Sequence, residues 1–118
     1  MVMKWKFKIP NKNGIEYGLN PASINKHIAW TKENIESDSK SEFSTYTENP
    51  QFEVMNLHIE AMSKFTTEDI VNILASDQRT RKVELWRMIG VDTKTGLSTT
   101  KICLSFNNEM KIHGYPCN

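Results

Sequence analysis

The sequence predicts an α+β domain in which a mostly antiparallel sheet carries two helices on one face, in the approximate order ββαββαββ. Three observations support this fold class. Residues 81–106 form two β-rich runs around a turn that contains Gly96. Two other segments, residues 20–37 and 66–77, combine a helix start with apolar residues at helical spacing. Residues 2–9 alternate between apolar side chains and lysines, as a half-buried strand does.

The chain is expected to open with a β-hairpin. The alternating residues 2–9 are followed by a dense turn signal at residues 10–14, and Ile15, Tyr17 and Leu19 then resume the alternation. We expect the lysines to protect this terminal strand against edge-to-edge association, although such a row is also able to follow a phosphate backbone. These lysines are Lys4, Lys6 and Lys8.

The first helix is expected to begin after Asn20 and to end near Ser37. Asn20 is a favourable N-cap, and Pro21 suits the first helical position because its missing N–H has no partner there in any case. One side of the helix would then face the core. That side consists of Ile24, Ile28, Thr31 and Ile35.

The next segment contains a short β-prone run at residues 43–47 and an ambiguous stretch at residues 50–62. Both a helix starting at Pro50 and an alternating strand fit the apolar residues of this stretch. We favour the strand because the preceding run gives it a partner, while its Glu, Met and Ala content leaves the helix open. A helix would bury Phe52, Met55, Ile59 and Met62, and a strand would bury Met55, Leu57, Ile59 and Ala61.

The second helix is expected to begin at Thr66 and to end near Asp77. Thr66 is able to cap its N-terminus, and the carboxylates of the first turn favour the positive end of the helix dipole. Beyond the hairpin that follows, the sequence predicts at most a short strand. Residues 114–118 are expected to form a flexible tail.

The hairpin of residues 81–106 is expected to place one face on the core, with Gly96 supplying the positive φ of its turn. Arg87 alternates with the apolar residues Leu85 and Ile89, so its side chain should point the same way as theirs. The pattern therefore leaves open whether Arg87 is exposed at the rim or buried and paired. The residues expected on the core face are Val83, Leu85, Ile89, Val91, Ile102, Leu104 and Phe106.

The composition is that of an ordinary soluble domain. The length of 118 residues predicts a single domain spanning 1–118, and the net charge of +1 argues against a strongly basic nucleic-acid binder. Cys103 falls in an expected core strand and Cys117 in the expected tail, which predicts neither a disulfide framework nor a zinc site. We therefore expect a reducing, cytoplasmic location without membrane association. The oligomeric state stays open.

Catalytic signatures are absent from the sequence. His27, His58 and His113 show no metal-ligand spacing, neither cysteine lies in a catalytic motif, and the glycines form no phosphate-binding loop. The sequence thus predicts no catalytic residue, no metal ligand and no cofactor. A small hydrolase or nuclease is kept as an alternative, and it would require His27, His58 and distant carboxylates to converge in one pocket.

The clearest candidate surface is the basic and aromatic side of the hairpin. All three arginines fall within nine residues, with a tryptophan among them, and arginine with exposed tryptophan is typical of binding surfaces. We expect a small non-enzymatic protein that binds a protein partner, such as an accessory or inhibitor protein of phage or mobile-element type. Binding of nucleic acid through residues 79–106 is the alternative. The candidate contact residues are Arg79, Arg81, Trp86, Arg87, Lys94 and Lys101.

Overall fold

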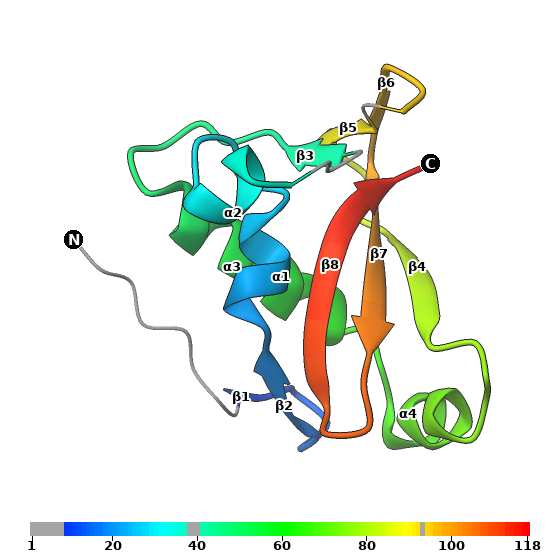
Figure 1. The fold of residues 1–118 in the computed structure, drawn as a ribbon. Helices are drawn as coiled ribbons and strands as arrows, with labels where there is room; N and C mark the ends of the chain where they lie inside the picture. The colour runs from blue at the N-terminus through cyan, green and yellow to red at the C-terminus, as the bar shows by residue number, and fades with distance from the viewer. Residues whose placement is uncertain (1–8, 38–40, 93) are drawn as a thin grey trace.

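The computed structural model describes residues 9–37, 41–92 and 94–118, which form one α+β domain with two sheets (Figure 1). The predicted fold class is confirmed. The alternating segment before Ile9, with Lys4, Lys6 and Lys8, lies outside the described residues. The strands are β1 (Ile9–Pro10), β2 (Glu16–Leu19), β3 (Ser41–Phe43), β4 (Thr80–Glu84), β5 (Gly90–Asp92), β6 (Leu97–Thr99), β7 (Lys101–Phe106) and β8 (Lys111–Cys117), and the helices are α1 (Pro21–Asn25), α2 (Lys32–Ile35), α3 (Pro50–Met62) and α4 (Thr67–Leu74).

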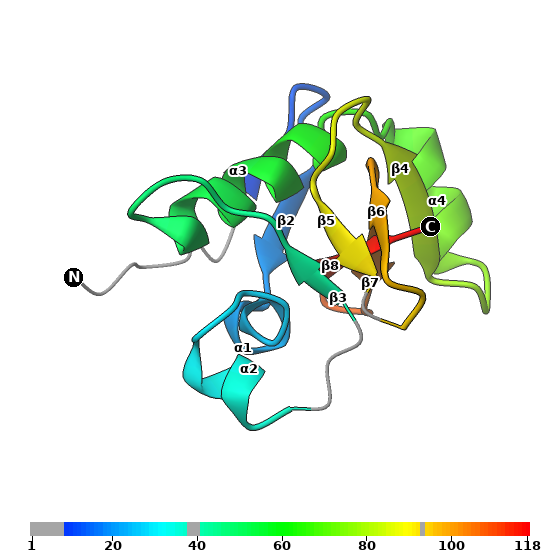
Figure 2. The ribbon, with the colours of Figure 1, turned by 90° about the horizontal axis from the view of Figure 1, so that it is seen from above.

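The larger sheet has the strand order β1-β2-β8-β7-β4, and the smaller one has the order β3-β5-β6. Strand β8 is central to the larger sheet, where it pairs parallel with β2 and antiparallel with β7. Helix α3 lies behind this sheet in Figure 1, and α4 lies beside β4 in both ribbon views (Figure 2). The core between α3 and the sheet includes Val54, Ala61, Met62, Ile102, Leu104 and Ile112.

The predicted hairpin is present, but it is divided between the two sheets. Val83 of β4 pairs with Ile102 of β7 in the larger sheet, whereas β5 pairs with β6 in the smaller one. Gly96 takes a φ of 74° in the turn, as expected. Between β4 and β5 the chain leaves the sheet at residues 85–89, so Arg87 lies in a loop and the strand alternation does not apply to it.

The first predicted helix is broken into α1 and α2. Asn20 caps α1 as expected, and Ile28 is buried, but Trp30 adopts a left-handed φ of 70° between the two helices. Thr31 explains the break, because its hydroxyl accepts the N–H of Asn34 and so starts a new helix. The expectation that Ile35 faces the core is therefore wrong, since 67% of its surface is exposed.

Residues 50–62 form helix α3, so the strand that the sequence favoured is wrong. Asn49 accepts the N–H of Phe52 as the N-cap, and Pro50 occupies the first turn. The buried side of the helix includes the polar residue His58, which has no exposed surface. Because this segment is a helix, it is not a partner for the short strand β3, which pairs with β5 instead. The buried residues of α3 are Val54, Met55, His58, Ala61 and Met62.

The end of the chain is a central strand, not the flexible tail that the sequence predicted. Strand β8 runs to Cys117, which is buried and forms a disulfide with Cys103, their Cα atoms 5.9 Å apart. Cys103 lies opposite Tyr115, and Lys101 lies opposite Cys117, so the antiparallel register makes the two cysteines diagonal neighbours. The expectation of two unpaired cysteines is therefore wrong, and the inference of a reducing location loses its basis.

Helix α4 begins as predicted. Thr66 and Asp69 form a capping box, in which each side chain accepts the backbone N–H of the other residue. The helix ends at Leu74, a little before the predicted Asp77. None of the helices within residues 9–37, 41–92 and 94–118 is both long and apolar enough to cross a membrane.

Candidate functional site

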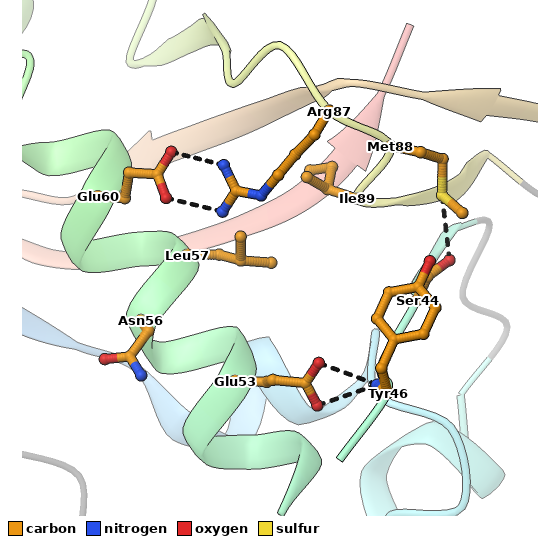
Figure 3. Close-up of a pocket in the computed structure, with 9 residues that line it drawn as sticks. All are labelled: Ser44, Tyr46, Glu53, Asn56, Leu57, Glu60, Arg87, Met88 and Ile89. Carbon is orange, nitrogen blue, oxygen red and sulfur yellow. Dashed lines mark hydrogen bonds and ion pairs between the residues drawn. The ribbon is translucent and has the colours of Figure 1, made fainter.

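An open hollow of about 230 Å³ lies between helix α3 and the loop of residues 85–89 (Figure 3). We call it the α3 groove. One wall is a single face of α3, because its contributing residues are three or four positions apart. The opposite wall comes from the loop, and the segment after β3 closes one end. The lining residues are Ser44, Tyr46, Glu53, Asn56, Leu57, Glu60, Arg87, Met88 and Ile89.

A forked ion pair spans the α3 groove at one end. The two terminal nitrogens of Arg87 donate to the two carboxylate oxygens of Glu60, at 2.8 and 2.7 Å. This hydrogen bonding lowers the pKa of Glu60 and raises that of Arg87. The side chains are 52% and 40% exposed, so the pair adds at most about 1 kcal/mol to stability. Arg87 is thus both exposed and paired, which answers the question that the sequence left open.

Glu53 organises the other end of the groove. Its carboxylate accepts the backbone N–H groups of Tyr46 and Thr47, and also the Thr47 hydroxyl. Burial raises the pKa of Glu53, but these hydrogen bonds outweigh it, and the pKa is lowered on balance. The bonds fasten the segment after β3 to α3. They leave the aromatic ring of Tyr46 on the rim, with 73% of the residue exposed.

The loop wall carries two further exposed apolar side chains. Trp86 is 81% exposed and precedes Arg87, while Met88 is 43% exposed and its sulfur accepts the Ser44 hydroxyl. The backbone of Trp86 has a left-handed φ of 63°. Its N–H donates to the carboxylate of Glu84 at 2.8 Å, which holds this conformation in place. The rim of the groove therefore presents a tryptophan, a tyrosine and a methionine to solvent.

The structure separates the six predicted contact residues. Trp86 and Arg87 meet at the α3 groove, but Arg79 donates to the carbonyls of Leu74 and Ser76 and so closes the end of α4. Arg81 likewise donates to backbone carbonyls, those of residues 78 and 80. The remaining two, Lys94 and Lys101, lie in the β5–β6 turn and on β7.

The histidines do not assemble the site that a hydrolase or nuclease would need. His58 is completely buried, and both ring nitrogens are hydrogen-bonded, to Val54 and Gly114. His27 is close enough to His58 to lower its pKa, but it lines an open hollow with Asp92 and His113 to which the buried His58 does not contribute. Among the described residues, no three histidine, cysteine or carboxylate side chains are placed to hold a metal ion.

Of the nine residues that line the α3 groove, only Arg87 was among the contact residues predicted from the sequence. Tyr46, Glu53, Leu57 and Glu60 were not predicted to act together, because residues 50–62 were assigned to a strand whose side chains would alternate. The Asn49-Pro50 pair was the signal that could have found them, since the same pairing correctly marked the start of α1.

Comparison of the chain with protein-family models, with curated proteins and with solved structures found no match. The function must therefore be inferred from the geometry and chemistry of the surface.

Proposed function

We propose that this protein acts by binding a protein partner in the α3 groove, as an accessory or inhibitor protein of phage or mobile-element type. Trp, Tyr, Met and Arg are the residue types enriched in protein interfaces. Tyr46, Arg87 and Met88 line the groove, and the exposed Trp86 directly precedes Arg87 in the loop that forms one wall. The two flanking carboxylates would add polar contacts at the edge of such an interface. A cytoplasmic location remains a prediction, although the disulfide favours an oxidising compartment.

The conformation of Trp86 is the observation that carries this proposal. A left-handed backbone costs a residue with a side chain about 1–2 kcal/mol, and most of this side chain is in water, so little burial offsets the cost. Glycine or asparagine would therefore adopt the backbone conformation of this position at a lower energetic cost. Contact with a partner would explain a tryptophan that the fold does not need. Trp30 has the same two features, so the proposal depends also on the position of Trp86 next to Arg87 and Met88 of the groove wall.

Nucleic-acid binding receives less support from the same surface. Arg87 is neutralised by Glu60, and Arg79 is held at the end of α4 by its bonds to Leu74 and Ser76, so the three arginines do not form one row. A phosphate backbone requires a row of cations that are available together. The charges on this side of the molecule are instead dispersed or paired.

The test is affinity capture from an extract of the native cell, after nuclease treatment, with three forms of the protein. Trp86→Gly should reduce capture of a specific protein at least about tenfold, because truncation of a central tryptophan costs that much in an interface. Trp30→Gly is the matched control, since Trp30 is also exposed and left-handed but lies between α1 and α2, outside the loop that forms the groove wall.

The folded state of each variant is checked by thermal unfolding. Glycine removes the strain of the left-handed backbone, but it loses more conformational entropy on folding than tryptophan does. These two effects on the free energy of unfolding nearly cancel, so we expect Trp86→Gly to be at least as stable as the wild type. Equal capture by all three forms would refute the proposal. Capture that disappears with nuclease would favour the nucleic-acid alternative.

A further inference from the structure

Strand β4 forms one edge of the larger sheet and pairs on one side only among the described strands. The N–H of Leu85 donates to Thr100, and the N–H of Phe106 donates to the carbonyl of Arg79. Residues 79 and 85 therefore direct their backbone polar groups toward β7, and so do the other odd-numbered residues between them. It follows that Thr80, Lys82 and Glu84 direct theirs away from the sheet.

A hollow of about 410 Å³ runs along this open edge. Four consecutive residues of β4, 81–84, line it. Because successive side chains of a strand point to opposite faces, a hollow that touches four in a row follows the backbone edge. Three buried apolar residues, Phe65, Ile73 and Val83, contribute to its lining. The hollow thus offers unpaired backbone groups beside an apolar surface.

Helix α4 provides the opposite wall. Asp69, Asn72 and Ile73 have the spacing of one helical face, and α4 lies alongside β4 in both ribbon views (Figure 1, Figure 2). An occupant is therefore enclosed by a strand edge on one side and a helix on the other. A single extended segment suits this shape, whereas the edge of a second folded sheet would meet α4.

The charges at the rim favour an acidic segment. Three cations and two carboxylates line the hollow. The cations are Lys64, Arg81 and Lys82, and the carboxylates are those of Asp69 and Glu84. Both carboxylates already accept backbone N–H groups, whereas Lys64 forms no ion pair among the described residues. Arg81 donates to neutral backbone carbonyls, so its charge also lacks a carboxylate partner, whereas Lys82 donates to an oxygen of Asn118.

We infer that β4 binds an extended acidic segment of a partner protein, which adds to the sheet as a further strand between β4 and α4. Backbone hydrogen bonds to Lys82 and Glu84 supply the affinity, and the apolar part of the hollow takes an aliphatic side chain. Carboxylates of the segment pair with Lys64 and Arg81. This site is separate from the α3 groove and does not depend on the function proposed for it.

The first test uses a fluorescent octapeptide in which valine and threonine alternate between terminal glutamates. Two further peptides carry N-methyl groups on alternate amides, one on the odd and one on the even positions. Only amides that face β4 form hydrogen bonds, so one methylated peptide should lose at least about tenfold in affinity and the other should bind like the parent. No binding of the parent at about 1 mM, or equal affinity of the two methylated peptides, would overturn the inference.

The second test changes the edge itself. Lys82→Pro removes an N–H that points to solvent, so the fold should tolerate it as edge strands tolerate proline. Peptide binding should fall at least about tenfold, whereas Lys82→Ala, which keeps the N–H and loses only the charge, should bind within about threefold of wild type. Thermal unfolding of both variants shows that they are folded. Equal peptide binding by wild type and Lys82→Pro would refute strand addition.

Amide hydrogen exchange examines the free protein without any peptide. The N–H groups of Thr80, Lys82 and Glu84 should exchange faster than those of Arg81 and Val83, in a two-residue alternation. Added octapeptide should slow the fast set selectively. Uniform protection along β4, or dimerisation that produces the same protection without peptide, would show that the edge is already covered and would contradict the inference.

Discussion

His58 is expected to make the protein sensitive to acid. Its imidazole is completely buried, Nε2 lies 2.8 Å from the N–H of Gly114, and Nδ1 lies 2.8 Å from the carbonyl of Val54. Because the Gly114 amide donates, Nε2 carries no proton, and the ring proton is on Nδ1. Protonation of Nε2 would break the bond to Gly114 and leave a charge in the core.

The size of the effect follows from the pKa of His58. Burial lowers it from 6.5 to about 4, and the hydrogen bond to Val54 opposes this only in part. The neutral ring therefore contributes its full stability above pH 6.5, and the contribution is lost as the pH falls toward 4. The loss amounts to about 3 kcal/mol, with a slope of about 1.4 kcal/mol per pH unit. Burial also lowers the pKa values of His27 and His113, which adds to the same trend.

The assay is urea unfolding of wild type and His58→Gln at several pH values from about 7.5 to 4. The glutamine oxygen is able to accept the Gly114 N–H and has no titration in this range. The wild type should lose about 3 kcal/mol more than the variant across the window. His27→Gln is the control. It keeps His58, so its free energy of unfolding should still fall steeply as the pH is lowered. Parallel pH profiles for wild type and His58→Gln, or an NMR titration midpoint of His58 near its ordinary value, would refute the reasoning.

Two further predictions concern the strands around β8. Cys117→Ser should lower the free energy of unfolding by about 3 kcal/mol, because the disulfide closes a loop with a sequence separation of 14. A melting temperature that neither the mutation nor a reductant changes would contradict this prediction. Gly114→Ala should cost about 1–3 kcal/mol in urea unfolding, since its Cβ would lie 2.8 Å from Ile102 and 2.9 Å from both Leu104 and the His58 ring. Wild-type stability of this variant would show that the space beside β8 is larger than the structure indicates.

Elements with strong local signals were predictable from the sequence. The hairpin turn at Gly96 and the caps at Asn20 and Thr66 form as expected, because each depends on residues within one turn of chain. The division of the hairpin between two sheets was not predictable. It depends on the loop of residues 85–89, whose Arg87 contacts Glu60 of α3, a residue far away in the sequence.

Helix α3 shows why its prediction failed. Its buried side contains His58, a residue that sequence patterns assign to the polar side, so the helical periodicity is diluted. The alternation of Met55, Leu57, Ile59 and Ala61 then fits a strand equally well. Only the tertiary partner of the ring, the N–H of Gly114, explains why a histidine is buried there.

The structure places the predicted contact residues on different elements for a geometric reason. The three arginines are close in sequence, but an extended chain advances about 3.3 Å per residue, so eight residues separate side chains by up to about 26 Å. Arg79 therefore reaches the end of α4, while Arg87 reaches α3. Residues that are close in sequence share a surface when they lie on one helical turn or in a tight loop. Along an extended strand they are more often far apart.

The two proposed surfaces meet at Glu84. This residue ends β4, so its backbone polar groups lie on the open edge, and its carboxylate accepts the N–H of Trp86. Hydrogen bonds from Thr100 and from the backbone lower the pKa of Glu84, so the carboxylate stays ionised and continues to hold Trp86 in its left-handed conformation at mildly acidic pH. A segment that pairs with the edge would order Glu84 and, through it, the start of the loop that forms one wall of the α3 groove. The two hollows share no lining residue, so a partner at one surface can affect the other only through this contact between Glu84 and Trp86.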